Sequence, residues 1–316
     1  MKIAYLGSGE FGIESLNSLL RSQHSLELVV TQPPHRAGRG RKSRPTPVAN
    51  WAAEHSVAFI EPENVNLPEV IEQISSFKAD LIVVAAFGQR IGNEIIAMPP
   101  KGIINAHASL VPKYRGAAPV NWAIINGDSE TGVSIITVVE KIDAGDILAQ
   151  VRTEIGEDET AGQLHDRLGI LAGPLLLEII DSIAGGAAIY TRQDHSQVTL
   201  ARKLKKSDGF LDFTDSAENL RNRIRGLWSW PGASAVYTSK KTGKSHQVTI
   251  AMAQVIEHDN PSDLAVGTLD ENLDVICGEN ALRITRIKPA GSSVMDFKPF
   301  VNGRQSSSGD VFTQIA

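Results

Sequence analysis

The chain has 316 residues, 42% of them hydrophobic, and a formal net charge of −5. This length suggests two domains of ordinary globular composition, and the acidic balance excludes a protein that is basic throughout. The single cysteine, Cys277, excludes an internal disulfide and fits a reducing compartment. The chain opens on a strand pattern rather than a signal peptide. Its most apolar segment, 170–180, is too short to cross a bilayer, so we expect a soluble, cytoplasmic protein.

Strand and helix patterns alternate over the first 155 residues. Strands are predicted at 3–6, 26–30, 81–86, 102–107, 133–139 and 147–155, and helices at 11–20, 47–55 and 67–75. Such alternation indicates a mostly parallel, Rossmann-like α/β sheet. In sheets of this kind, ligands bind beyond the carboxyl ends of the strands.

A long helix is predicted at 160–183, where Gly169, Gly173 and Pro174 suggest a kink or a break. A polar segment then leads to a basic stretch that we interpret as a linker. The expected division is therefore a catalytic domain at 1–200, a basic linker at 201–206 and a C-terminal domain at 207–316.

The C-terminal region predicts one helix followed by short strands. Asp215 and Glu218 have the spacing of a capping box at the start of a helix at 217–227. Strand patterns follow at 233–238, 247–256, 273–277 and 281–287, and turn residues separate them. Strands at this spacing suggest a small β-barrel.

The first turn of the chain contains a glycine pattern typical of dinucleotide binding. Gly7, Gly9 and Gly12 form a G-x-G-x-x-G between the first strand and the first helix. The fingerprint also needs an acidic residue at the end of the second strand, where this chain has Val29-Val30-Thr31-Gln32. The glycines therefore favour a tight strand-to-helix turn, and an NAD-dependent dehydrogenase stays as an alternative.

A polar pair at the end of a predicted strand is the strongest site signal. Side chains alternate along a strand, so Asn105 and His107 project to the same side. Asp143 follows the strand predicted at 133–139. An amide, an imidazole and a carboxylate can stabilise an oxyanion and handle a proton when an acyl group moves to an amine. The structural alternative is a turn-capping Asn105 and a buried, hydrogen-bonded His107.

Segment 105–116 reads Asn-Ala-His-Ala-Ser-Leu-Val-Pro-Lys-Tyr-Arg-Gly, and Asp-Ala-Gly-Asp follows at 143–146. It resembles the signature of the folate-dependent formyltransferases, Asn-x-His-x-Ser-Leu-Leu-Pro-x-x-x-Gly followed by Asp-x-Gly-Asp. Val111 stands where the family usually has Leu, which keeps an apolar side chain there. The resemblance covers nearly the whole chain and implies an OB-like C-terminal barrel. It also implies 10-formyltetrahydrofolate as co-substrate.

In the mechanism that this resemblance implies, the amine attacks the formyl carbon directly. Asn105 and protonated His107 stabilise the oxyanion, and Asp143 pairs with His107 and relays the proton. The folate is expected to lie against Phe87, Gly88, Gln89, Ser109, Leu110, Val111, Pro112, Val139 and Asp146. No third ligand stands at metal-like spacing beside His107 and Asp143, so we expect no metal.

A positive cluster occupies positions 36–44. The region before position 200 has 16 Lys and Arg residues and 23 acidic residues. Five of those 16 basic residues lie in this cluster: Arg36, Arg39, Arg41, Lys42 and Arg44. A structureless loop of this size is usually functional, and guanidinium groups suit phosphate capture. The alternative is a solvated surface loop. In the branch of the family that acts on methionyl initiator tRNA, a basic loop with an Ala-Gly-Arg-Gly core, as at 37–40 here, enters the acceptor arm.

A second basic group follows position 200 and is expected to contact the tRNA backbone. It consists of Lys203, Lys205 and Lys206 beside Arg202, with Arg221, Arg223 and Arg225 near in sequence. The region from position 207 has 11 basic and 13 acidic residues, so it is not positive as a whole. We interpret Trp228 and Trp230 as core residues rather than base-stacking platforms.

The expected function is thus formyl transfer from 10-formyltetrahydrofolate to the α-amine of methionyl initiator tRNA, by a monomer that does not bind membranes. Three alternatives stay open. One is a formyltransferase for a small amino substrate, such as a sugar nucleotide or a purine precursor. The others are the dehydrogenase and a non-catalytic RNA-binding protein.

Overall fold

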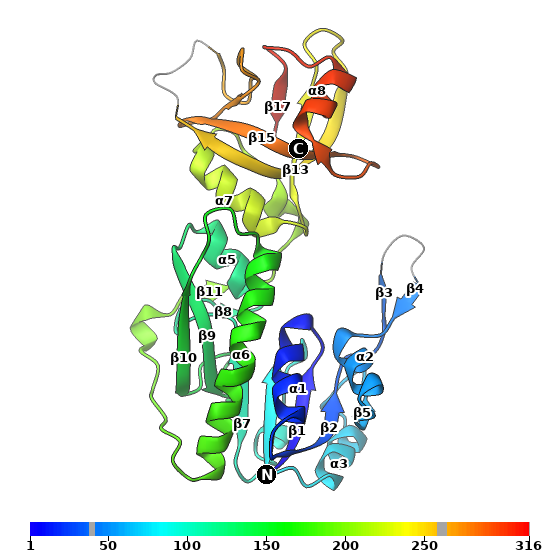
Figure 1. Cartoon of the computed structure of the whole chain (residues 1–316), viewed down its shortest axis with the longest axis vertical. Coiled ribbons are helices and arrows are strands. Elements are labelled where there is room, and N and C mark those ends of the chain that lie inside the picture. The colour runs from blue at the N-terminus through cyan, green and yellow to red at the C-terminus, as the bar shows by residue number, and fades with distance from the viewer. Residues whose placement is uncertain (38–41, 258–263, 316) are drawn as a thin grey trace. The chain divides into compact units, whose positions relative to one another are not determined.

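The structure is a computed structural model that describes residues 1–37, 42–257 and 264–315 (Figure 1). It divides into two compact units. The first comprises Met1–Pro119, Glu130–Glu154 and Leu164–Ala201, and the second comprises Val120–Ser129, Ile155–Gln163 and Arg202–Ala316. The division into a catalytic domain at 1–200, a basic linker at 201–206 and a C-terminal domain at 207–316 stays a prediction.

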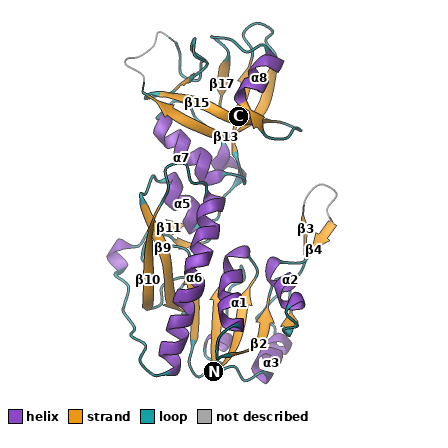
Figure 2. Cartoon of the chain, viewed as in Figure 1, coloured by secondary structure: helices purple, strands orange, loops and turns teal. Residues whose placement is uncertain are grey.

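The first unit contains a seven-stranded sheet in the order β10-β9-β7-β6-β1-β2-β5. Its strands are β1 (Lys2–Gly7), β2 (Ser25–Val30), β5 (Phe59–Ile60), β6 (Leu81–Ala85), β7 (Ile103–His107), β9 (Glu130–Thr137) and β10 (Ile147–Glu154). Five neighbouring strands are parallel to one another, in the order β7-β6-β1-β2-β5. Strands β9 and β10 are antiparallel to their neighbours. The predicted mostly parallel, Rossmann-like sheet is confirmed (Figure 2).

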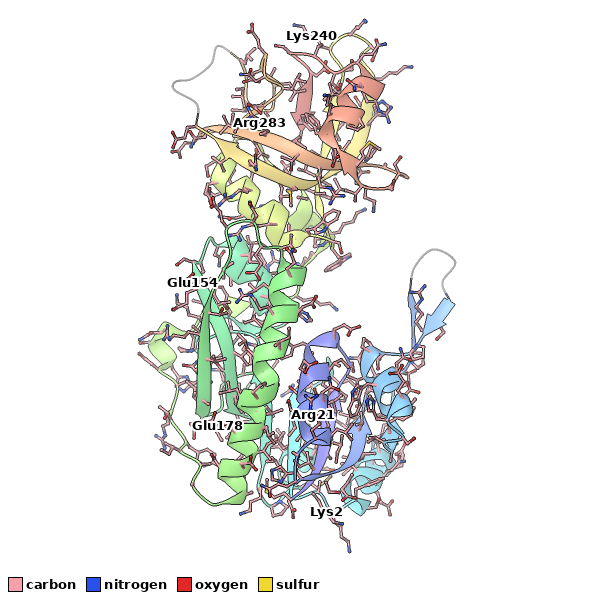
Figure 3. All side chains as sticks on the ribbon, in the orientation of Figure 1. Lys2, Arg21, Glu154, Glu178, Lys240 and Arg283 are labelled. Carbon is pink, nitrogen blue, oxygen red and sulfur yellow. The ribbon has the colours of Figure 1, made fainter. Side chains whose placement is uncertain are left out.

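Helices accompany this sheet. They are the short 3-10 helix η1 (Glu10–Gly12), then α1 (Ile13–Leu20), α2 (Pro47–Glu54), α3 (Pro68–Ser76), α4 (Asn93–Ile96) and α6 (Ala161–Ala184). The sequence explains where α2 begins, because the Thr46 hydroxyl accepts a hydrogen bond from Ala49 N and proline occupies the first turn. Apolar side chains of the parallel strands, such as Leu6, Val30 and Ile82, form a buried core. Charged side chains such as Lys2, Arg21 and Glu178 are exposed (Figure 3).

Helix α6 continues without interruption through Pro174, so the predicted break is wrong. The glycines before it allow close packing rather than ending the helix. A Cβ at Gly173 would lie 2.7 Å from Glu14 O, and one at Gly169 would lie 3.1 Å from Phe11 O. Helix α6 can therefore lie beside η1 and α1 with its backbone almost in contact (Figure 1).

The glycine-rich first turn is explained by packing. A Cβ at Gly7 would lie 2.7 Å from Ala85 O, and one at Gly12 would lie 2.2 Å from Tyr5 Oη. Tyr5 is fully buried, and its hydroxyl donates to Gly12 O over 3.0 Å. Close packing of Gly7 against the neighbouring strand and of Gly12 against the buried Tyr5 therefore accounts for both glycines, and nucleotide binding is not required to explain them.

The prediction of a structureless loop at 36–44 is wrong for the two ends of this segment. Strands β3 (His35–Ala37) and β4 (Lys42–Arg44) form an antiparallel hairpin in which His35 lies opposite Arg44. Residues 38–41, which include Arg39 and Arg41, lie outside the described residues.

The second unit contains a six-stranded antiparallel, barrel-like sheet, as expected. The order is β14-β15-β13-β12-β17, with β16 paired to β15. Its elements are β12 (Ala233–Thr238), β13 (Ser245–Ile256), β14 (Val275–Ile276), β15 (Ala281–Pro289), β16 (Met295–Asp296) and β17 (Val311–Thr313), with α5 (Pro119–Ile125), α7 (Ala217–Leu227) and α8 (Phe297–Arg304). Helix α7 has its predicted bounds, but the capping box is wrong. Ser216 is the N-cap and accepts from Asn219 N, whereas Asp215 bonds to Ser216 N.

In the described part of the chain, no helix combines the length and apolar character that crossing a bilayer requires.

Cys277 lies in the core of the second unit and is 5% exposed. Burial raises the pKa of its thiol to about 12. Because only the thiolate reacts with disulfide reagents, we expect no labelling of the native protein at pH 8 and one labelled thiol after unfolding in guanidinium. Following the absorbance of a chromogenic disulfide reagent checks this. Fast labelling without denaturant would contradict the burial of Cys277.

Candidate active site

Two polar side chains at the end of β7 meet the carboxylate of Asp143. In the sheet, Asn105 lies opposite Ile136 and His107 lies opposite Ser134, both on β9. Asn105 Nδ2 is 3.4 Å from Asp143 Oδ1, and His107 Nδ1 is 3.7 Å from Asp143 Oδ2. The structure therefore brings together the three residues that the sequence singles out, at the carboxyl end of a parallel strand.

The imidazole of His107 is held in one orientation by the backbone. Its Nε2 lies 3.0 Å from Tyr114 O, and a carbonyl oxygen can only accept, so Nε2 carries a proton. The remaining nitrogen, Nδ1, faces the carboxylate of Asp143. A proton on Nδ1 as well would leave both N–H groups facing acceptors and would place a positive charge beside Asp143.

Asp143 occupies a tight turn with a φ of 50°, in the left-handed region that non-glycine residues rarely adopt. Its side chain is 12% exposed. Oδ2 accepts from Gly116 N over 2.8 Å, which ties the turn to the segment that follows His107. The two loops of the site are thus linked through this one carboxylate.

The base of the Asp143 loop is closed by Thr137, at the end of β9. Thr137 N donates to Asp146 O over 2.9 Å, and Asp146 N donates to the Thr137 hydroxyl over 2.8 Å. A Cβ at Gly145 would lie 1.9 Å from Thr137 O, so only glycine fits between them. The carboxylate of Asp143 is therefore carried by a loop with a closed base.

No motif in the sequence points to Gln193, yet it contacts this loop directly. It lies in the polar segment after α6, is 5% exposed, and donates from Nε2 to the carbonyls of Asp143 and Gly145. Its Oε1 accepts from Arg115, which lies within the signature segment and is 3% exposed.

The residues expected to bind folate divide by exposure. Phe87, Ser109 and Val111 are buried, and Gln89 bonds inward to Val65 N and Pro62 O. The other five residues are partly or fully exposed, and Val139 is 42% exposed. They are Gly88, Leu110, Pro112, Val139 and Asp146. Folate contacts by all nine residues stay a prediction.

The basic residues expected to bind tRNA also divide. Arg36, Lys42 and Arg44 belong to the β3–β4 hairpin, where Arg44 is exposed, and Lys203, Lys205 and Lys206 are exposed in the second unit. The arginines near these lysines form ion pairs or are buried within the second unit. Arg202 pairs with Asp208, Arg221 pairs with Glu157 and Glu218, and Arg225 is buried.

Trp230 is 59% exposed to solvent, so its interpretation as a core residue is wrong.

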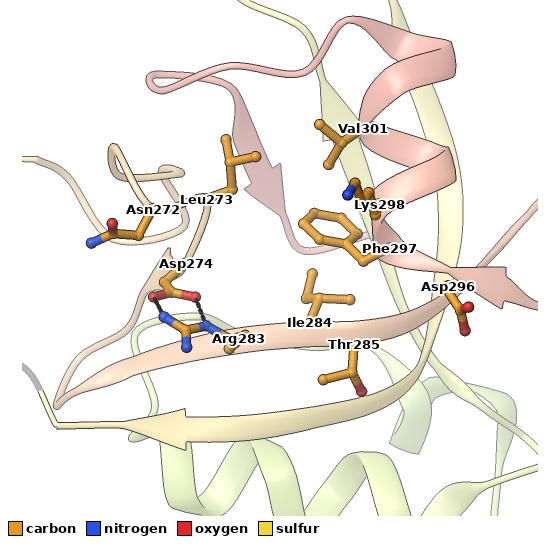
Figure 4. Close-up of a pocket in the computed structure, with 10 residues that line it drawn as sticks. All are labelled: Asn272, Leu273, Asp274, Arg283, Ile284, Thr285, Asp296, Phe297, Lys298 and Val301. Carbon is orange, nitrogen blue, oxygen red and sulfur yellow. Dashed lines mark hydrogen bonds and ion pairs between the residues drawn. The ribbon is translucent and has the colours of Figure 1, made fainter.

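A cavity in the second unit contains none of these residues (Figure 4). Ile284, Phe297 and Val301 line it, and an ion pair between Asp274 and Arg283 stands at its edge. Among the described residues, no three His, Cys, Asp or Glu side chains form a group that could hold a metal ion. The expectation that no metal is used stays a prediction.

A mostly parallel sheet with an amide and an imidazole at the carboxyl end of one strand, beside a loop carboxylate, is the arrangement of a group-transfer enzyme of the Rossmann-like α/β class. The family model described as formyl transferase matches residues 1–180, and that described as formyl transferase, C-terminal domain, matches residues 203–305. The chain therefore belongs to the formyl transferase family.

Two relatives illustrate the similarity. The methionyl-tRNA formyltransferase of Caldanaerobacter subterraneus subsp. tengcongensis is 38% identical over 314 residues, which cover 98% of this chain and 99% of the relative. The methionyl-tRNA formyltransferase of Methylococcus capsulatus is 38% identical over 305 residues, with 96% of each chain covered.

Two solved structures share the fold. One is WlaRD, a sugar 3N-formyl transferase solved with dTDP and 5-N-formyl-THF, with a TM-score of 0.65 and 14% identity over 93% of this chain and 99% of that one. The other is the N-formyltransferase of Helicobacter canadensis, solved with folinic acid and dTDP-3-aminofucose. Its TM-score is 0.62 at 15% identity, over 92% of this chain and 98% of that one.

Proposed function

We propose that this enzyme transfers the formyl group of 10-formyltetrahydrofolate to the α-amine of methionyl initiator tRNA. The observation that carries the proposal is the convergence of Asn105 and His107 on Asp143 at the carboxyl end of β7. Relatives that are 38% identical over almost the whole chain and are named methionyl-tRNA formyltransferase support the choice of acceptor.

The oxyanion is the first requirement of the reaction. When the amine attacks the formyl carbon, negative charge develops on the formyl oxygen, and N–H groups held in place stabilise it most strongly where water is excluded. Asn105 Nδ2 carries two hydrogens, and its contact with Asp143 is long at 3.4 Å. We assign the amide of Asn105 and a proton on His107 Nδ1 as the donors to this oxygen.

The proton of the attacking amine is the second requirement. A free α-amine has a pKa of about 8, so about a quarter of it is neutral near pH 7.5 and no strong base is needed before attack. After attack the nitrogen is cationic and must lose a proton. Asp143, whose carboxylate already accepts from Gly116 N and faces His107, is the acceptor that we assign to this proton, directly or through one water. The bond between the formyl carbon and N10 of the folate then breaks, and N10 takes the proton back from Asp143, so that tetrahydrofolate leaves as a neutral amine.

Acceptor competition tests the proposal. The protein is incubated with formyl-labelled 10-formyltetrahydrofolate and one of three acceptors: methionyl initiator tRNA, a dTDP-linked amino sugar, or glycinamide ribonucleotide. We expect label on the aminoacyl end of the tRNA only. Label on either small acceptor in place of the tRNA would overturn the choice of substrate, and label on none would overturn formyl transfer.

The basic segment at 36–44 is assigned to the tRNA. Replacing Arg39 and Arg41 together by Ala is expected to raise the KM for tRNA and to reduce the salt dependence of kcat/KM, because two phosphate contacts are lost. Steady-state rates measured between 50 and 200 mM KCl check both effects. Arg21→Ala with Lys101→Ala is the control, since it removes the same charge near the amino ends of β2 and β7, at the edge opposite the site. Equal tRNA kinetics in the two variants would contradict the assignment.

We also assign a cytoplasmic location and a monomeric state to the protein, with Lys203, Lys205 and Lys206 as further contacts to the tRNA backbone. Their exposure supports the last assignment.

A further inference from the structure

A short segment after α6 lies across both loops of the active site. We call residues 191–201 the strap. At its start, Thr191 exchanges backbone hydrogen bonds with Ile147, the first residue after the Asp143 loop. At its end, strand β11 (Leu200–Ala201) pairs with strand β8 (Arg115–Gly116), and Ala117 N donates to Ala201 O over 2.7 Å. The strap thus contacts the segments that follow His107 and surround Asp143.

Gln193 lies near the start of the strap, and both polar atoms of its side chain are hydrogen-bonded to the two loops of the site. Both hydrogens of Nε2 are donated, to Asp143 O over 2.9 Å and to Gly145 O over 2.6 Å. Its Oε1 accepts from Arg115 Nε over 3.1 Å and from Nη2 over 2.7 Å. A buried amide with every hydrogen bond made in this way permits a single orientation.

Arg115 fixes the other side of that amide. Its guanidinium is buried, and Nη2 also lies 3.3 Å from His195 Nδ1 on the strap. Burial lowers the pKa of Arg115, and the nearby carboxylate of Asp143 opposes this. Arginine keeps its charge in proteins, so the positive charge of Arg115 and the negative charge of Asp143 favour each other's burial.

The backbone of Asp143 needs such a restraint. At a φ of 50°, the backbone of Asp143 lies in the left-handed region, a conformation that a residue with a side chain keeps only when its surroundings hold it there. The carbonyl that Gln193 binds belongs to this strained residue. Freed from Gln193, the turn can relax, and the carboxylate would leave its contacts with Asn105 and His107.

We propose that Gln193, oriented by Arg115, is a positioning residue that holds the Asp143 turn in its reactive geometry. The proposal rests on the proposed function, because it assumes that Asp143 acts in formyl transfer. Gln193 contacts neither Asn105 nor His107 through any described hydrogen bond, so its effect on the rate passes through Asp143.

The first test replaces Gln193 in two ways. Gln193→Ala removes both donors. Gln193→Glu keeps the size and the acceptor for Arg115 but turns a carboxylate oxygen toward two carbonyl oxygens. We expect kcat for tRNA formylation to fall about 10- to 10²-fold in both, as for a misplacement of about 1 Å, with the KM values for tRNA and folate within about threefold. Gln197→Ala, on the exposed part of the strap where Nε2 meets only Asp194, is the matched control and should keep full activity.

A double-mutant cycle separates positioning from a general loss of structure. In the Asp143→Ala background there is no carboxylate to position, so Gln193→Ala should lower the residual kcat less than about twofold further. A structural role alone would lower kcat by the same factor in both backgrounds. Circular dichroism and thermal unfolding of each variant establish that the folded fraction is equal.

The outcomes distinguish this proposal from the proposed function. If Asp143→Ala keeps normal turnover, the role of Asp143 falls. If Asp143→Ala loses turnover but Gln193→Ala and Gln193→Glu do not, or if the two effects multiply in the double variant, the positioning role of Gln193 is overturned while the function stands.

Discussion

Replacing Asn105 or Asp143 by alanine is expected to lower kcat for tRNA formylation by about 10²–10³-fold, or about 2.7–4 kcal/mol of transition-state stabilisation. Asn105→Ala removes an N–H donor to the developing oxyanion. Asp143→Ala removes the proton acceptor and the group that faces His107 Nδ1 at 3.7 Å. Single-turnover rates with saturating folate and charged tRNA measure the chemical step directly.

Binding should survive these changes. The folate is expected to rest mainly against neighbouring segments, so its dissociation constant, measured by calorimetry, should change less than about threefold, which is under about 0.7 kcal/mol. Asp166→Ala, which removes an exposed carboxylate from α6, is the control and should leave kcat unchanged. Near-normal kcat in either site variant would show that the polar cluster at the end of β7 is structural.

Gly145→Ala is expected to lower kcat by about 10²-fold although it removes no functional group. The added Cβ would lie 1.9 Å from Thr137 O and 2.5 Å from the Thr137 hydroxyl. Neither atom can move away, because Thr137 belongs to β9 and closes the loop through two hydrogen bonds with Asp146. The loop must open at its base, which displaces Asp143, two residues away, from Asn105 and His107.

A second glycine substitution provides the comparison for Gly145→Ala. Gly162 lies in the first turn of α6, where a Cβ would have no heavy atom within 4 Å. Gly162→Ala should therefore leave kcat unchanged and stabilise the helix by up to about 1 kcal/mol. Steady-state kinetics and thermal unfolding of both variants give the result, and equal activity of the two would refute a closed loop base.

Much of the fold was predictable because secondary structure depends on neighbouring residues. Alternating strand and helix patterns indicated the parallel sheet, and helix α7 and strand β12 have the predicted bounds. Helix α6 shows the limit of local patterns. Gly169 and Gly173 are typical of a helix break in the sequence. In the structure, the absence of a side chain at these positions lets the helix pack closely against the backbone of Phe11 and Glu14, more than 150 positions earlier in the chain.

The site divides in the same way. The sequence by itself determined that Asn105 and His107 share one face of a strand, because side chains alternate with a period of two, and the signature made Asp143 their partner. Only the tertiary structure decided that Nε2 of His107 bonds Tyr114 O, and that Gln193 holds Asp143 from 50 positions away. Contacts of the second kind depend on how loops pack once the sheet has formed, and no local periodicity records them.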